Sequence, residues 1–122
     1  MVKKDLYIPY KATLIIQPGV ILYFEKNIKV VVEGTLQSEG KIEKAIKFTA
    51  LPGSLTSGFW DGIYFIGPES QGHITNTIIE YSNAGIYCQS SYQILIEHNL
   101  LRNNKLYNIY CLGNSSPQIV NN

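Results

Sequence analysis

Few residues in this sequence are suited to acid–base or nucleophilic chemistry. Its 122 residues include two aspartates, Asp5 and Asp61, which are far apart in the sequence, and a single arginine, Arg102. Hydrolysis of a glycosidic bond needs two carboxyl groups about 5–9.5 Å apart, and no pair of acids with a suitable pattern stands out. The positions of Glu80 and Arg102 differ by 22, and we expect these two to form a surface ion pair worth about 0–1 kcal/mol. The sequence therefore predicts no catalytic residue.

Four side chains are candidate metal ligands: Cys88, Cys111, His73 and His98. A structural zinc site needs four ligands at recognisable spacing, such as CxxC pairs, and these residues lack that spacing. A lone histidine on the surface of a protein is more often solvated than bound to a metal. We therefore expect neither a metal nor a cofactor.

The two cysteines belong to a tetrapeptide that occurs three times. GIYF at 62–65, GIYC at 85–88 and NIYC at 108–111 follow one another at one constant interval, since 85−62 and 108−85 both equal 23. TIIEY at 77–81 and NLLRN at 99–103 repeat with a step of 22 (99−77) and alternate along the chain, which is the period-2 signature of a strand. No long segment keeps the period of an amphipathic helix. The chain is therefore predicted to be all-β.

A unit of about 22–23 residues is too small to bury its own apolar side chains, so it needs neighbouring copies. Stacked copies form a continuous core, and each strand pairs in parallel with its equivalent in the next coil. The sequence thus predicts a parallel β-helix of about five coils, with equivalent residues stacked about 4.8 Å apart. The predicted interior ladders are Ile63, Ile86 and Ile109; Phe65, Cys88 and Cys111; and Thr77, Asn99 and Asn122. Further interior positions are expected at Leu14, Ile16, Val30, Val32, Phe48, Ile79, Ile96 and Leu101, and exposed positions at Lys29, Glu33 and Glu80.

The first half of the chain suggests a different repeat length. Leu14 and Ile16 align with Val30 and Val32 with a step of 16 (30−14). The stretch LPGSLTSGFWDG is rich in glycine, serine and proline, which predicts a loop that projects from the coil, an insertion near 50–62. The length fits a single domain over 1–122.

Cys88 and Cys111 are expected at equivalent positions on successive coils. Their Cα atoms would then be close enough for a disulfide, but in-register parallel strands direct both sulfur atoms the same way. We expect buried free thiols that act as small hydrophobic side chains.

Several segments together resemble the right-handed parallel β-helix proteins of the pectin-lyase-like superfamily: ATLIIQPGVILYF, IKVVVEGTLQSEG, AIKFTA, GFWDGIYF and NTIIEYSNAGI. These segments most resemble those of bacterial and archaeal surface or secreted proteins. The tail, which contains IEHNLLRNN and NSSPQIVNN, is similar to the repeats of the periplasmic, copper-associated NosD-like group. The resemblance covers nearly the whole chain. It implies a right-handed parallel β-helix in an extracellular, periplasmic or cell-surface protein.

The resemblance says more about fold than about function, because the shared motifs build the scaffold. Lyases of the superfamily carry a cluster of calcium-binding aspartates with a catalytic arginine or lysine, and the polygalacturonase-like branch carries an NTD…DD…RIK pattern. This sequence has neither, and Asp61 stands where the family usually has a glycine in a structural turn. We expect a non-catalytic module of a secreted or surface protein, structural or carbohydrate-presenting. The alternative is a fragment of a polysaccharide lyase or glycoside hydrolase whose catalytic coils lie outside these residues.

The repeated tetrapeptide also places three tyrosines at one position. Because its other apolar residues face inward, Tyr64, Tyr87 and Tyr110 should point outward in a single column. These rings, together with Trp60, are the candidate contacts for the sugar rings of a polysaccharide. The other interpretation is an aromatic ladder that stabilises neighbouring strands by about 0.2–1 kcal/mol per pair, and this is the interpretation that the sequence favours.

The composition and the ends of the chain bear on partners. Ten Lys and Arg residues balance nine Asp and Glu residues, and the pI is about 7.7, whereas nucleic-acid-binding domains often exceed about 9. No apolar run approaches the roughly 20 residues of a membrane-spanning helix, and the first residues do not form a signal peptide.

Both ends are strand-like, so we expect a fragment of a longer protein. We also expect self-association as a dimer through the uncapped C-terminal coil.

Overall fold

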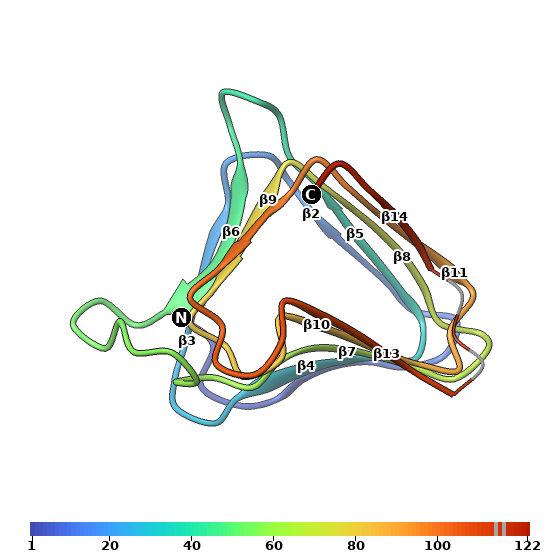
Figure 1. Cartoon of the computed structure of the whole chain (residues 1–122), viewed down its shortest axis with the longest axis horizontal. Coiled ribbons are helices and arrows are strands. Elements are labelled where there is room, and N and C mark those ends of the chain that lie inside the picture. Colours follow the sequence, from blue (N-terminus) through green and yellow to red (C-terminus); the bar gives the residue numbers. More distant parts are fainter. Residues whose placement is uncertain (114, 116) are drawn as a thin grey trace.

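The computed structural model describes residues 1–113, 115 and 117–122, and it forms a solenoid of triangular cross-section (Figure 1). Among these residues the chain has fourteen strands and no helix, and therefore no helix long and apolar enough to cross a membrane. The strands are β1 (Leu6–Ile8), β2 (Thr13–Ile16), β3 (Ile21–Phe24), β4 (Lys29–Val32), β5 (Thr35–Glu39), β6 (Ile46–Ala50), β7 (Gly62–Ile66), β8 (Gln71–Thr75), β9 (Thr77–Glu80), β10 (Ile86–Gln89), β11 (Gln93–Glu97), β12 (Leu100–Arg102), β13 (Ile109–Leu112) and β14 (Gln118–Val120).

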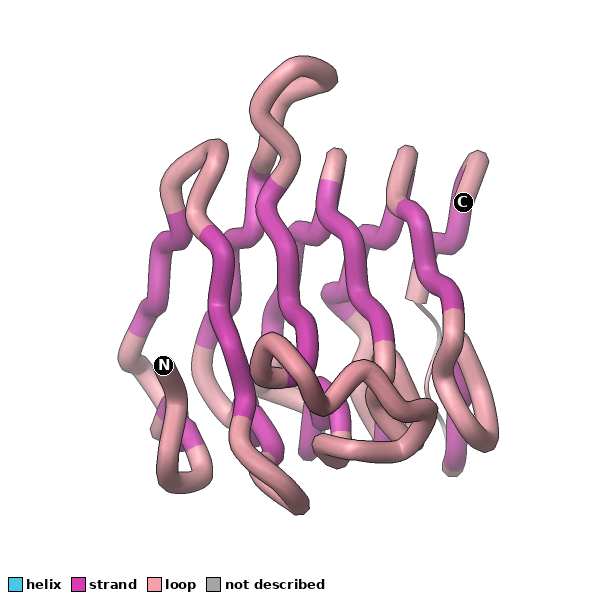
Figure 2. The backbone as a smooth tube through the Cα atoms, turned by 90° about the vertical axis from the view of Figure 1, so that its left-hand side faces the viewer, coloured by secondary structure: helices cyan, strands magenta, loops and turns pink. Residues whose placement is uncertain are grey.

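The strands stack into three parallel sheets, one on each side of the triangle. Sheet I has the order β1-β4-β7-β10-β13, sheet II the order β2-β5-β8-β11-β14, and sheet III the order β3-β6-β9-β12. Each strand is followed along the chain by a strand of the next sheet, so one coil contributes one strand to each side. Figure 2 shows the coils side by side, with sheet III facing the viewer. The predicted all-β parallel solenoid is confirmed.

The interval between the repeated tetrapeptides equals the length of one coil, measured between paired strands of sheet I. The strands β7, β10 and β13 pair in register, which stacks two of the predicted ladders: Ile63, Ile86 and Ile109, and Phe65, Cys88 and Cys111. Each residue of one coil therefore lies directly beside its equivalent in the next coil, as expected for a solenoid built from repeats.

The register of the first coils differs from the sequence-based expectation. The alignment of Leu14 with Val30 is wrong. Leu14 pairs with Leu36, a step of 22 (36−14), and Leu6 pairs with Val30, a step of 24 (30−6). The strands β2 and β4 lie in different sheets, and they look alike in sequence because each buries every second residue. The next step, from Val30 to Ile63, is longer because two loops intervene.

The interior of the solenoid is filled with apolar side chains from all three sheets. Most of the predicted interior positions are buried: Ile16, Val30, Val32, Phe48, Ile63, Phe65, Ile79, Ile86 and Ile96. Leu14, Leu101 and Ile109 are only half-buried, because in this structure they lie in the first and last coils, which have a neighbouring coil on one side only. Lys29 and Glu33, expected to be exposed, are half-buried on the outer face.

A polar ladder lines the corner between sheets II and III. The Thr77 N–H donates to Oδ1 of Asn99 at 2.9 Å, and the Asn99 N–H donates to Oδ1 of Asn122 at 3.2 Å. The ladder contains the predicted residues, although Asn122 at its end is exposed and not interior as expected. Ser38 extends the ladder by one coil, with its hydroxyl 2.9 Å from that of Thr77. The residues directly before Thr77, Asn99 and Asn122 each have a positive φ, which turns the chain at this corner. They are Asn76 (46°), His98 (56°) and Asn121 (51°).

The other two corners carry polar ladders that were not anticipated. The Ser70 hydroxyl donates to Oγ of Ser91 at 2.8 Å, and the Ser91 N–H donates to Oγ of Ser115 at 3.1 Å. At the third corner, the Ser82 N–H donates to Oδ1 of Asn104 at 3.0 Å. The members of each ladder recur in the sequence at close to the coil length, which was a usable signal. Each ladder supplies buried backbone groups with the partners that they need.

Candidate functional site

The outer face of sheet I carries a column of tyrosines. The strands β7, β10 and β13 place Tyr64, Tyr87 and Tyr110 at paired positions, all half-buried. The column continues toward the N-terminus through Val31 of β4 and Tyr7 of β1. The structure thus brings together the three tyrosines that the repeat predicted, and their ligand-binding role stays a prediction.

The rings of this tyrosine column stack on one another. Tyr64 and Tyr87 have ring centroids 5.0 Å apart at an interplanar angle of 38°, and Tyr87 and Tyr110 are 5.4 Å apart at 17°. Tyr107 tilts against Tyr110 with centroids 4.4 Å apart. Because these separations are typical of aromatic pairs, each ring contacts its neighbour. Part of each ring is therefore occupied within the column, and the remainder faces solvent.

Two phenol groups of this face, those of Tyr64 and Tyr7, have a raised pKa. Burial raises the pKa of Tyr64, and the neighbouring Asp61 and Tyr87 raise it further. A hydrogen bond to Glu33 raises the pKa of Tyr7, whose hydroxyl donates to Oε1 of that carboxylate. Both hydroxyls therefore remain protonated and able to donate at physiological pH.

Trp60 is not part of this surface, and the expectation that it contacts a ligand is wrong. Its side chain is completely buried. The indole stacks on Phe24 with ring centroids 4.1 Å apart and an interplanar angle of 7°, and Nε1 donates to the backbone oxygen of Glu80 at 2.8 Å. Trp60 lies at the end of the loop between β6 and β7, and it turns inward there to close the core.

Glu80 was expected on the surface, and this expectation is also wrong. Its side chain is only 6% exposed, although it points outward from sheet III. Oε2 accepts from Nε of Arg102 at 2.8 Å, Oε1 accepts from the Thr49 hydroxyl at 3.0 Å, and Nζ of Lys47 lies 3.8 Å away. The predicted partnership with Arg102 is therefore present, but it holds a buried carboxylate that its neighbours on the outer face of the sheet cover.

Asp61 also makes a structural contact. Its Oδ1 accepts from Nδ2 of Asn83 at 2.8 Å, and its backbone oxygen accepts from the Ala84 N–H at 3.1 Å. The residue thereby joins two successive coils at the corner between sheets III and I. Both candidate acids, Asp61 and Glu80, are engaged in contacts between coils.

The two histidines lie in neighbouring coils, His73 in β8 and His98 directly after β11, the strand that pairs with β8. His73 lies between two carboxylates of neighbouring coils, with Nδ1 2.7 Å from Oε1 of Glu39 and Nε2 3.5 Å from Oε1 of Glu97. This arrangement was not anticipated, since it depends on the pairing of β5, β8 and β11. His98 is exposed at a corner. Among the residues that the structure describes, no group of three or more His, Cys, Asp or Glu side chains could hold a metal ion.

The cysteines are both free thiols, but only one is buried. Cys88 is enclosed in the core, whereas Cys111 is exposed, contrary to the expectation of two buried thiols. The reason is that β13 is the last strand of sheet I in this structure. Burial raises the pKa of Cys88 to about 12, with further contributions from Cys111 beside it.

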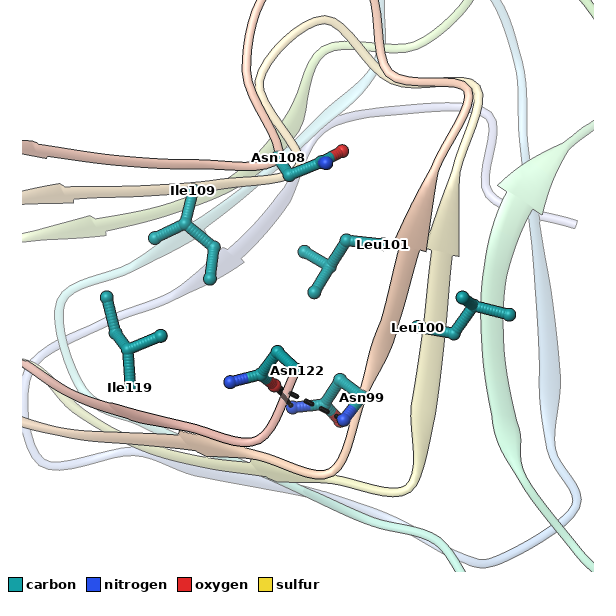
Figure 3. A pocket seen from close by; sticks show the side chains of 7 residues that line it. All are labelled: Asn99, Leu100, Leu101, Asn108, Ile109, Ile119 and Asn122. Carbon is teal, nitrogen blue, oxygen red and sulfur yellow. Dashed lines mark hydrogen bonds between the residues drawn. The ribbon is translucent and has the colours of Figure 1, made fainter.

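A cavity of about 380 Å³ lies at the C-terminal end of the solenoid (Figure 3). Ile109, Leu101 and Ile119 point into it, and the hydrogen-bonded amides of Asn99 and Asn122 form its polar side. These residues occupy positions whose equivalents in the preceding coil are buried, including Ile96, which pairs with Ile119. The cavity is therefore the end of the core.

The comparisons with known proteins agree with this architecture. No curated protein and no solved structure matches the chain. A family model described as a right-handed β-helix region matches residues 50–122, which is more than half of the sequence. The matched segment contains the repeated tetrapeptides and the tyrosine column. On this basis the chain belongs to the family of right-handed β-helix proteins.

Proposed function

We propose that this chain is a non-catalytic β-helix module that binds a polysaccharide along the tyrosine column of sheet I. The observation that carries the proposal is the register of three successive coils, each of which presents one tyrosine at the same outward position. A polymer of repeating sugar units that runs along the solenoid axis can meet the same chemical group at each coil.

The chemistry of the column suits such a ligand. Tyrosine combines an apolar ring with a polar hydroxyl, so it can pack against the C–H groups of a sugar and donate to its oxygens. A second outward row lies beside the tyrosines and consists of Ile66, Gln89 and Leu112. The exposed amide of Gln89 adds a donor and an acceptor in the middle of this face.

The contacts of the candidate acids support a non-catalytic role. Asp61 and Glu80 bind neighbouring side chains of the fold, so neither carboxylate is presented to a substrate. The stacked rings also stabilise the solenoid, and both roles are compatible because ring edges and hydroxyl groups remain on the surface. A polysaccharide ligand further favours a parent protein that is secreted, periplasmic or on the cell surface.

Glycan-array binding followed by titration calorimetry tests the proposal. Tyr87→Ala removes the central ring and should weaken binding by about tenfold or more, the loss of a typical aromatic anchor. Tyr92→Ala is the matched control, because Tyr92 is an exposed tyrosine outside the column. Tyr87→Phe keeps the ring and should lose only the contribution of the hydroxyl group.

Two results would contradict the proposal. One is the absence of binding to any glycan by the folded wild-type chain. The other is an equal loss of affinity in Tyr87→Ala and Tyr92→Ala. If Tyr87→Ala lowers the thermal unfolding midpoint and leaves glycan affinity unchanged, the column serves the stability of the coils alone.

A further inference from the structure

The outer face of sheet III lies between two projecting loops. Residues 40–45 precede β6 and residues 51–61 follow it, so the loops rise at the two ends of the same strand (Figures 1 and 2). The second loop is fixed to the next coil, since the Gly58 N–H donates to the Ser82 oxygen at 3.2 Å and the Phe59 N–H to the Tyr81 oxygen at 2.9 Å. We call this face the sheet III groove.

Cavities lie at both ends of the sheet III groove. One, of about 210 Å³, is lined by Tyr23, Lys47 and Glu80 of the floor and by Pro52 and Leu55 of the second loop. The other, of about 290 Å³, is lined by Ile78 and Leu100 of the floor and by Lys41, Ile42 and Ala45 of the first loop. The two cavities share one continuous sheet face, and an extended segment that lies along the strands would reach both.

The groove exposes aliphatic side chains. Ile21 and Leu100 of the floor are 45% and 46% exposed, and Leu55 and Ile42 of the walls are 56% and 90% exposed. Exposed apolar side chains that gather on one face of a protein commonly mark an interaction site. Tyr23 lines the first cavity and the imidazole of His98 lines the second, and the other lining side chains are aliphatic or polar, which distinguishes the groove from the tyrosine column.

The groove is also positively charged. In its floor the Glu80 carboxylate lies between the cationic groups of Lys47 and Arg102, which leaves one positive charge in excess. Arg102 donates to Glu80 through Nε, and no other described residue accepts a hydrogen bond from its guanidinium group. Its remaining N–H groups are therefore available to an anion. In the first wall Lys41 and Lys44 outnumber Glu43, and the second wall contains Asp61, so the floor and the two walls together carry one positive charge in excess.

We infer that the sheet III groove binds an extended segment of a partner protein that carries aliphatic side chains and at least one carboxylate. The guanidinium of Arg102 can bind a carboxylate through paired hydrogen bonds, and the aliphatic side chains of the segment bury against Leu55, Leu100 and Ile42. The charge of the groove complements an acidic segment and opposes a basic one. This site is separate from the polysaccharide site on sheet I.

Selection of random dodecapeptides on phage against the immobilised chain tests this inference. The recovered peptides should be enriched in Asp, Glu, Leu, Ile and Val, and their affinity should fall as the salt concentration rises. Leu55→Ser and Ile42→Ser should each weaken a recovered synthetic peptide by about fivefold or more, as expected for interface side chains. Tyr87→Ala, in the other site, should leave peptide affinity unchanged.

The variants are chosen so that the fold survives. Ile42 and Leu55 are exposed loop residues, and their replacement should not shift the thermal unfolding midpoint. Arg102→Lys keeps the charge beside Glu80 but loses the planar fork of donors, so it should reduce peptide affinity and retain the folded state. The inference is overturned if no peptide is enriched, if basic peptides are enriched, or if binding is unaffected by both loop substitutions. It is also overturned if the groove variants abolish glycan binding and have no effect on peptides.

Discussion

Arg102 and Glu80 form an ion pair between adjacent coils of sheet III, with Nε and Oε2 2.8 Å apart. The carboxylate is almost completely buried and the guanidinium is about half-exposed, with side-chain exposures of 6% and 47%. The pair therefore differs from a fully exposed one, because removal of the arginine leaves a buried negative charge with fewer partners.

This asymmetry predicts that Arg102→Ala lowers the free energy of unfolding by about 1–3 kcal/mol, the penalty for a buried acceptor that loses a partner. Lys47 and the Thr49 hydroxyl still contact Glu80, which keeps the loss below that of a fully isolated charge. Urea denaturation measures the change. Arg102→Met combined with Glu80→Met should recover much of the stability, and a double variant less stable than Arg102→Ala would contradict this explanation.

Ile86 lies in the centre of the predicted isoleucine ladder and is completely buried between Ile63 and Ile109. Ile86→Ala should cost about 2–5 kcal/mol through lost transfer energy and the cavity left behind. Ile109→Ala is the matched comparison, since Ile109 is only half-buried, and it should cost clearly less. Equal losses in chemical denaturation would show that position along the ladder does not matter.

Asn99 is buried in its ladder, between Thr77 of one neighbouring coil and Asn122 of the other. Its Oδ1 accepts from the Thr77 N–H, and its Nδ2 donates to the Ile74 oxygen at 2.8 Å and to Oδ1 of Asn122 at 2.9 Å. Asn99→Ala should destabilise the fold by about 2–4 kcal/mol, because it leaves two buried backbone groups without partners. Asn122→Ala should cost less, since Asn122 is exposed. The order of the two unfolding midpoints is the measurement.

The thiols should differ in reactivity. Because burial raises the pKa of Cys88 to about 12, this thiol should remain protonated and protected at pH 8, whereas the exposed Cys111 should react. Ellman's reagent should therefore titrate one thiol in the folded protein and two after denaturation. A single fast phase with two thiols in the folded state, or no free thiol after non-reducing denaturation, would contradict the structure.

The same shift makes stability depend on pH. From about pH 9, the ordinary pKa of the thiol, up to about pH 12, the unfolded chain loses the proton of Cys88 while the folded chain retains it. Because the folded state binds more protons over this interval, its stability should fall as pH rises. In Cys88→Ala this part of the alkaline loss should disappear, as followed by denaturation at several pH values.

The sequence alone determined the coil length in the second half and the inward ladder of isoleucines. It could do so because in-register stacking forces equivalent residues into equivalent environments, so selection repeats them once in every coil. The same logic predicted the ladder of Thr77, Asn99 and Asn122. In the first coils it failed, because strands of different sheets share the same alternation and Leu14 could be aligned with Val30 as easily as with Leu36.

Only the tertiary structure decided the environments on the outer faces. Alternation predicts that Glu80 points away from the core, but it cannot show that Arg102, Thr49 and other neighbours cover this position. The inward turn of Trp60 onto Phe24 and the placement of His73 between Glu39 and Glu97 likewise depend on side chains from other coils. Strand periodicity records which side of a sheet a residue occupies. What lies over that side is decided by loops and neighbouring coils, whose positions follow from packing in three dimensions.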